Sequence, residues 1–361
     1  MNPGARSTAF LPLVLALLVA VLIWLPDMGR SPAAPAQQTV QRKKSYLPAV
    51  SNQNISSAPP VVSTSLYMLS KDLAKLTAEG CAMGRRDLGL AGKQDSIVVL
   101  AFGYPQKSAS GVYGTHGYGY PAKPWTIAEI TAAVENFGYA YWNCTDADFD
   151  SHLRIAIGTN NYKGDVNVAV NADHGKAWAN MVAAVNDWFI NSCPQGCNGQ
   201  VDAVGASDIE LSWNTAAATT DWLNGYASVT KYPLYNFGAI EGCPWLAKPS
   251  YTCLWGSKEQ VWYVVWGSPP VQPLPEIYLT SGVNAEQWYL MSVYSYEKHG
   301  EKMQFVGPMT ETQACEQEGG CPGIDNPPAA AWWQLYNLLN GDWRTTGEAL
   351  PYSTDIKWLG R

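Results

Sequence analysis

The sequence predicts an α/β fold in which one parallel sheet forms a (β/α)8-like, TIM-type barrel, complete or irregular, with disulfide-stapled loops. Three observations predict it. Roughly eight short apolar segments alternate with helical patterns, 47% of the residues are hydrophobic, and neither an internal repeat nor a second linker divides the body. A doubly wound open sheet is the alternative, but no G-x-G-x-x-G follows a strand and no P-loop lysine is present.

Apolar runs mark the expected strands. Short runs bounded by turn residues are typical of strands that are buried on both faces of a parallel sheet. The least regular of these runs is residues 166–170. The expected strands are residues 96–102, 153–157, 166–170, 201–211, 234–240, 261–266, 276–279 and 303–306.

Apolar residues at helical spacing mark the helices between these strands. Thr126 and Glu129 form a capping box before an apolar stripe that predicts a helix. The glycine-rich segments 103–104 and 114–119 are interleaved with Tyr and His, and they predict a mobile aromatic loop. The further expected helices are residues 175–189, 221–229, 284–298 and 329–340, the last ended by Gly341.

The amino-terminal region predicts export. Residues 9–26 are uncharged and almost wholly apolar, Arg6 supplies a basic start, and residues 34–36 form an A-x-A-like cleavage candidate. The protein is therefore expected to be extracellular, either secreted or anchored to the outer face of the cytoplasmic membrane. The expected segments are a signal peptide or signal anchor at 1–30, a Pro/Ser/Ala-rich linker at 31–65 and the barrel domain at 66–361.

Eight cysteines follow the linker, and export favours disulfides. Eight cysteines allow 105 pairings, so pairing between sequence neighbours is only the simplest choice. Half a zinc site at Cys193 and Cys197 is the competing interpretation, but no second close Cys or His pair lies near it, so no metal is expected. The expected disulfide cysteines are Cys193 and Cys197, Cys243 and Cys253, Cys315 and Cys321, and the remaining Cys81 and Cys144.

The charge of the body excludes some partners. The chain has a net charge of −7, and its first 44 residues carry five basic groups and one acid, so the remainder has a net charge of −11. Nucleic acid is therefore excluded, because phosphates need Lys and Arg. A neutral glycan fits better, since 16 Trp and 20 Tyr can pack on sugar rings. No cofactor motif is present.

The sharpest local signal is Asp208-Ile-Glu210, at the end of the expected 201–211 strand. Two residues apart on a strand, the two carboxylates share one face, with Cα atoms roughly 6.5–7 Å apart. Catalysis in barrels occurs at this end of the strands, where one acid can keep its proton while the other stays charged. The competing interpretation is structural: Asp208 caps a turn and Glu210 meets a basic partner.

This motif resembles the D-x-E of family 25 glycoside hydrolases, the Chalaropsis-type lysozymes. The resemblance implies an exported (β/α) barrel in which Glu210 is the general acid and Asp208 assists it. That family has a further Asp on its first strand, whereas residues 98–105 of this sequence contain none. The remaining chain resembles uncharacterised exported bacterial proteins.

Four other residues are candidates for substrate binding. Trp213, just past the acid pair, and Tyr104 are expected to stack on sugar rings. Asn160 is expected to bond sugar hydroxyls, with a turn as the alternative. Glu311 follows residues 303–309 at a plausible carboxyl end.

Two further acids are ranked lower. Glu241 lies beside Cys243, which suggests a stapled loop. Glu276 opens the expected 276–279 strand and would therefore lie at the wrong end of it.

Together these residues predict an extracellular glycoside hydrolase-like protein that acts on cell-wall or environmental polysaccharide by carboxylate acid/base catalysis. The alternative is a non-catalytic glycan-binding or surface barrel, which the missing first-strand acid favours. No nucleic acid partner is expected, and the membrane is contacted only through an uncleaved amino-terminal segment.

Overall fold

Parallel strands form the centre of the structure, a computed structural model that describes residues 58–361 except 120, 147 and 165–166. Eight strands lie in the order β10-β11-β1-β2-β6-β7-β8-β9. All neighbouring pairs in this sheet are parallel, so the predicted α/β class is confirmed. The strands are β1 (Ser63–Met68), β2 (Asp95–Ala101), β6 (His152–Asn160), β7 (Val201–Asp208), β8 (Leu234–Asn236), β9 (Val271–Pro273), β10 (Met309–Thr310) and β11 (Thr354–Leu359).

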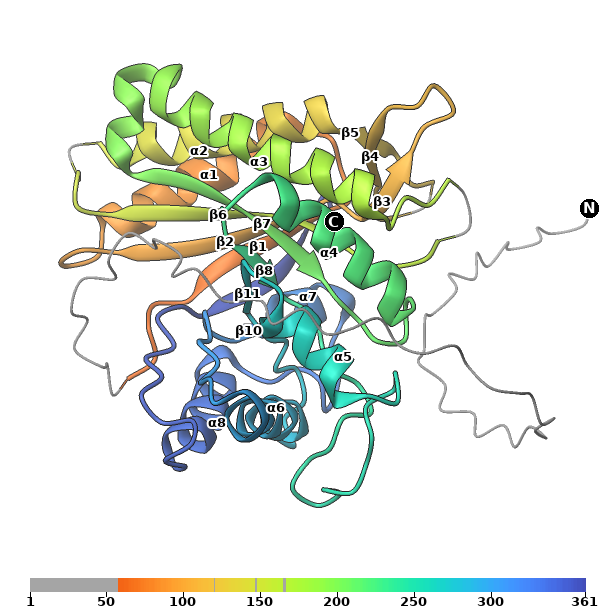
Figure 1. Ribbon diagram of the computed structural model, residues 1–361. Coiled ribbons are helices and arrows are strands. Elements are labelled where there is room, and N and C mark those ends of the chain that lie inside the picture. Colours follow the sequence, from red (N-terminus) through yellow and green to blue (C-terminus); the bar gives the residue numbers. More distant parts are fainter. Residues whose placement is uncertain (1–57, 120, 147, 165–166) are drawn as a thin grey trace, which may run out of the picture. The chain divides into compact units, whose positions relative to one another are not determined.

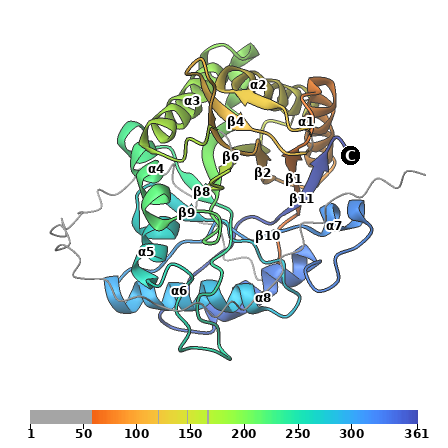
Figure 2. The ribbon, with the colours of Figure 1, turned by 90° about the vertical axis from the view of Figure 1, so that its right-hand side faces the viewer.

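The sheet is curled into a half-barrel, with helices outside the curl (Figure 2). Past the end of β9, backbone hydrogen bonds reach the other outermost strand, β10. Met309 N donates to Pro275 O at 2.8 Å, and Ile277 N donates to Met309 O at 2.9 Å. These bonds connect the segment that follows β9 to β10, at the carboxyl edge of the sheet.

Local capping explains where the helices begin. Thr126 N donates to the Glu129 carboxylate while Glu129 N donates to Thr126 Oγ1, which confirms the expected capping box. Figure 1 shows α1, α2 and α3 along one side of the strands and α6 and α8 along the opposite side. The helices are α1 (Leu73–Leu88), α2 (Ile127–Cys144), α3 (Ala172–Asn191), α4 (Ala216–Val229), α5 (Lys258–Trp262), α6 (Val283–His299), α7 (Thr312–Glu318) and α8 (Pro328–Asn340), with short 3-10 and π turns at Pro194–Gly199 and Tyr263–Gly267.

The glycine-rich segment after β2 forms a second, antiparallel sheet, so the expectation of a mobile loop there is wrong. Its strands pair in the order β3-β4-β5. A Cβ on Gly114 would lie 1.8 Å from Trp125 O, so glycine is needed for the close approach of the strands. The strands are β3 (Tyr104–Lys107), β4 (Tyr113–His116) and β5 (Pro124–Thr126).

Alternate residues of the main sheet face two apolar layers. Val98 and Leu100 of β2 belong to the layer that packs against the helices. Ile97 and Val99 belong to the inner layer, with Val204 of β7. Burial of both faces explains why the central strands are continuous apolar runs.

A partly buried ion pair lies near the amino ends of the strands, with side-chain exposures of 17% for Arg154 and 33% for Asp202. Arg154 of β6 donates to Asp202 of β7 through Nε at 2.8 Å and Nη2 at 2.6 Å. Its Nη1 donates to the Tyr235 hydroxyl at 3.2 Å. Two parallel bonds neutralise both charges in a fixed geometry.

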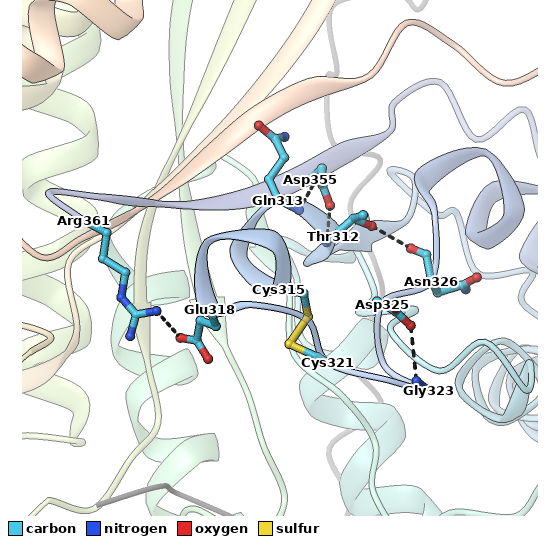
Figure 3. Close-up of a disulfide and its surroundings, with 10 residues drawn as sticks. All are labelled: Thr312, Gln313, Cys315, Glu318, Cys321, Gly323, Asp325, Asn326, Asp355 and Arg361. Carbon is cyan, nitrogen blue, oxygen red and sulfur yellow. Dashed lines mark hydrogen bonds and ion pairs between the residues drawn. A yellow bond between two sulfur atoms is a disulfide. The ribbon is translucent and has the colours of Figure 1, made fainter. Parts of the chain in front are cut away.

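The eight cysteines form four disulfides: the three pairs that are close in sequence, as expected, and the remaining Cys81 and Cys144. Figure 3 shows the Cys315–Cys321 disulfide beside α7, where Arg361 also forms an ion pair with Glu318 at 2.8 Å. Disulfides persist in oxidising compartments, so four of them indicate such an environment. The other pairs are Cys81–Cys144, Cys193–Cys197 and Cys243–Cys253.

Several expected strands differ in the structure. Residues 261–266 form α5 and the π turn, because the Ser257 side chain caps a helix by accepting from Gln260 N. The described residues of the expected 166–170 strand, 167–170, form no strand, and Val168 makes an isolated bridge there. Residues 303–306 do not form the expected strand, and the nearest strand is β10, which begins at Met309. The expected 234–240 strand is shorter, because β8 ends at Asn236.

β1 and β11 are not expected from the sequence, although they pair with each other. Some residues of β1 and β11 that face the inside of the curled sheet are polar, so these segments lack the apolar pattern typical of a buried strand. Ser65 of β1 and Thr354 of β11 hydrogen-bond through their hydroxyls at 2.7 Å. β1 also begins inside the predicted 31–65 linker.

The predicted signal or anchor at 1–30 and most of the linker lie outside the described residues. Within the part of the chain that the structure describes, no helix is both long and apolar enough to cross a membrane.

Candidate active site

The end of β7 carries the acid pair that the sequence predicts. β7 ends at Asp208, so Glu210 lies beyond the strand, which corrects the expected 201–211 strand. Asn161 holds this turn, because its Nδ2 donates to Glu210 O at 3.0 Å and its Oδ1 accepts from Glu210 N at 3.1 Å. Asp208 is 3% exposed and Glu210 is 9% exposed. Both acids are therefore fixed and largely buried at the carboxyl end of a central strand.

A third acid, Glu276, joins this pair. One carboxylate oxygen from each of Asp208, Glu210 and Glu276 lies within 4.8 Å of the other two, and we call these residues the acid triad. The expectation that Glu276 opens a strand at 276–279 is wrong. The strand is β9, so Glu276 follows its carboxyl end and forms a parallel bridge with Met309.

Burial and mutual repulsion raise the pKa of every carboxyl in the acid triad. Burial is the largest cause in each case, and the next is a second triad carboxylate: Glu210 for Asp208, Glu276 for Glu210, and Asp208 for Glu276. Among the described residues, Asp208 Oδ1 has no hydrogen-bond partner. Close carboxyls of this kind lose their protons as a group, so the triad retains protons towards neutral pH.

Hydrogen bonds hold two of the triad carboxyls in place. Glu210 Oε1 accepts from Ala239 N at 2.8 Å, and Glu276 Oε1 accepts from the Tyr278 hydroxyl at 2.7 Å. Each bond favours the ionised carboxylate and so opposes the rise in pKa. Burial and repulsion therefore favour the protonated carboxyls of the triad, whereas these hydrogen bonds favour the ionised forms of Glu210 and Glu276.

Two more acids flank the triad. Glu241 accepts from Leu211 N and from Ser212 Oγ, both at 2.7 Å, so it fixes the turn after Glu210. Glu311 follows β10 directly, at a carboxyl end as predicted, and burial raises its pKa to about 7. Its charge in turn raises the pKa of two triad carboxyls.

Three rings line the inner face of the sheet beside the triad, and we call them the inner aromatic wall. Tyr67 of β1 stacks on Tyr118 with ring centroids 5.2 Å apart and planes within 9°. Trp358 of β11 packs edge-on against both, at 5.2 and 5.8 Å. Burial raises the pKa of both tyrosines, and the next cause is Asp208, so their hydroxyls lie within reach of its charge.

The predicted stacking residues Tyr104 and Trp213 belong to a second aromatic group. Tyr162 lies between them, edge-on to Tyr104 at 5.5 Å and to Trp213 at 5.9 Å. Tyr104 also stacks on His116 at 4.7 Å. We call Tyr104, Tyr162 and Trp213 the outer aromatic row.

Asn160, at the end of β6, contacts both aromatic groups. Its Oδ1 accepts from Tyr162 N at 3.0 Å. Its side chain also favours the ionised Tyr118 hydroxyl, which opposes the burial that raises the pKa of Tyr118. The turn expected here is present, and the expected contact with sugar stays a prediction.

The acid triad supports two kinds of chemistry. Carboxyls with raised pKa values can donate protons to a substrate near neutral pH. Three converging carboxylate oxygens are also the donors that Mg²⁺ and Ca²⁺ prefer. The expectation that no metal binds stays a prediction.

The sequence does not predict Glu276, Tyr67, Tyr278 or Trp358 as site residues. β9 is only three residues long and ends in Pro273, so little in the sequence places Glu276 after a strand. The alternation of polar and apolar residues in Thr354–Leu359 is the signal that could have located Trp358.

The chain matches no protein-family model, and no curated protein sequence is significantly similar to it. The fold and the site of this chain therefore rest on its own residues.

Proposed function

We propose that this protein is an exported glycoside hydrolase that acts on cell-wall or environmental polysaccharide. The observation that carries the proposal is the acid triad, in which carboxyls from two separate strand ends converge within 4.8 Å at the carboxyl edge of the sheet. Carboxyl pairs with separate roles are the machinery of glycosidic cleavage. The resemblance of Asp208-Ile-Glu210 to the family 25 motif supports the same class.

We further propose that the half-barrel is part of a complete (β/α)8 barrel. The backbone hydrogen bonds between the segment after β9 and β10 support it. In such a barrel the carboxyl edge is the face at which catalysis occurs.

In the proposed mechanism Glu210 is the general acid. Burial and the charges of neighbouring carboxyls raise its pKa, so it holds the proton that the glycosidic oxygen receives as its bond to the sugar breaks. Glu276 is the ionised partner that stabilises the positive charge on the sugar or bonds to it, since hydrogen bonds from both Tyr278 and Glu210 favour its ionised form while its charge raises the pKa of Glu210. Water then completes the hydrolysis and returns its proton to Glu210.

The second candidate is a glycan-binding barrel without catalysis. One observation favours it: each triad residue is less than one-tenth exposed, and the polypeptide already supplies hydrogen bonds to Glu210 and Glu276. Such acids can be structural.

The test is release of reducing ends from peptidoglycan and a panel of polysaccharides by the disulfide-bonded protein. Glu210→Gln is expected to lower the rate by about 10²- to 10⁴-fold without unfolding the protein. Glu135→Gln, a partly exposed acid of α2, is the control and should match wild type. Equal rates for Glu210→Gln and wild type would refute the role of Glu210, and saturable binding without any product would support the second candidate.

A further inference from the structure

The carboxyl edge of the sheet divides into two parts that meet at β7. Acids follow β7, β9 and β10, whereas the rings of the outer aromatic row follow β2, β6 and β7. These last three are neighbours in the sheet, so the row extends along consecutive strand ends. The loop after β7 carries both Glu210 and Trp213.

Short hydrogen bonds connect the row to the triad. Asn161 bonds both backbone groups of Glu210, and the residue before it, Asn160, accepts from Tyr162 N at 3.0 Å. Lys163 N donates to Trp213 O at 3.2 Å. The same turn after β6 therefore positions a proposed catalytic acid on one side and two rings of the row on the other.

The rings of the row are accessible. Tyr162 is 37% exposed, and Tyr104 and Trp213 are partly exposed. Two of the three rings carry a hydroxyl, so the row offers apolar faces for sugar C–H groups and polar edges for sugar hydroxyls. The acidic body favours a neutral chain over a polyanion.

We infer that the outer aromatic row is a distal subsite for a neutral glycan chain, so that the enzyme acts on polymers rather than on small glycosides. This inference rests on the proposed function, because it takes the acid triad as the place of cleavage. The chain would extend from the triad over Trp213 and Tyr162 to Tyr104. The rings far from the acid triad would then contribute only to the binding of substrates long enough to reach them.

The first test measures retention of the inactive full chain on insoluble polysaccharides: peptidoglycan, chitin, cellulose, xylan, mannan and β-1,3-glucan. Glu210→Gln is expected to bind at least one of them. Adding Tyr162→Ala should weaken that binding about three- to tenfold, and Tyr162→Phe should restore it, because the ring supplies the contact. Tyr139→Ala is the control, because Tyr139 of α2 is also 37% exposed beside an aromatic ring but lies outside the row.

The second test measures cleavage with the catalytic acid intact. Tyr162→Ala is expected to raise KM on the polymer three- to tenfold with little change in kcat, and to leave cleavage of an aryl monoglycoside unchanged. If the wild-type protein cleaves the polymer and Tyr162→Ala behaves like Tyr139→Ala, the subsite is refuted while the proposed function stands. If the wild-type protein cleaves nothing but binding depends on Tyr162, the proposed function fails and the outer aromatic row is the glycan-binding site of the second candidate, not a subsite of an enzyme. Binding to none of the six polysaccharides would refute the subsite.

Discussion

The acids at the two ends of the curled sheet lie in opposite electrostatic environments. Near the amino ends of the strands, Asp202 accepts two hydrogen bonds from Arg154. At the carboxyl ends Asp208, on the same strand, faces two more carboxyls and keeps one oxygen without a partner among the described residues. Compensated charge at one end stabilises the fold, whereas uncompensated charge at the other lowers stability and raises the pKa of its carboxyls. The two ends of the sheet therefore differ in their electrostatics.

Removing the compensating charge should have the largest effect. Arg154→Ala removes the main partner of the partly exposed Asp202, which keeps only His152 at 3.6 Å, and frees the Tyr235 hydroxyl, so the free energy of unfolding should fall by about 2 to 3 kcal/mol at pH 7. Urea unfolding measures this loss. The double variant Arg154→Met with Asp202→Asn removes both charges and should regain most of the stability. A loss below about 1 kcal/mol in Arg154→Ala would show that the amino end does not depend on this pair.

The pH dependence of stability should come from the carboxyl end. The pKa of Glu311 is raised to about 7, so the folded state binds more protons than the unfolded state between about pH 4.5 and 7. Stability is therefore expected to fall as pH rises through this window. Glu311→Gln should be as stable as wild type at pH 4 and about 2 kcal/mol more stable at pH 8.

Urea unfolding at the two pH values checks this. Other buried acids, such as Glu348, have raised pKa values as well, so the difference between Glu311→Gln and wild type at each pH isolates the one residue. A constant difference across both pH values would contradict the assignment.

A matched pair of substitutions on β7 should give the smallest effects, of opposite sign. Asp202→Asn weakens the ion pair and should lower the free energy of unfolding by about 1 kcal/mol. Asp208→Asn removes a charge from the acid triad and should raise it by about 1 kcal/mol at pH 7.5 while lowering turnover. Denaturant unfolding of both variants in one buffer gives the comparison. Destabilisation in both would show that the two ends are electrostatically alike.

The sequence predicts the parts of the fold in which the local pattern and the tertiary environment agree. β2 and β6 are apolar runs because both faces of each strand are buried, and α2 has a complete capping box. Residues 261–266 have the same β-branched and aromatic composition as a strand, but a helix cap at Ser257 overrides it. Polar residues hide β1, because the hydroxyls of Ser63 and Ser65 have partners nearly 300 residues away, in Ser353 and Thr354.

The candidate site divides in the same way. Asp208 and Glu210 are recognisable because both lie in one short motif after a strong strand. Glu276 and Trp358 reach the same place through distant elements, and no local pattern records which strand ends converge. Trp213 and Tyr104 were expected separately, and the sequence does not show that Tyr162 lies between them.

The position of β11 has a consequence for synthesis. β11 is the last described strand to leave the ribosome, yet it pairs on one side with β1 and on the other with β10. The sheet therefore stays open between its first and seventh strands until residues 354–359 arrive, and contacts this distant in sequence form slowly. Tyr67 lies on one of the two strands that wait for this insertion, and Glu311 directly follows the other. Truncation before β11 removes Trp358 and leaves these two strands unconnected, so it should yield an unstable protein whose inner aromatic wall is incomplete.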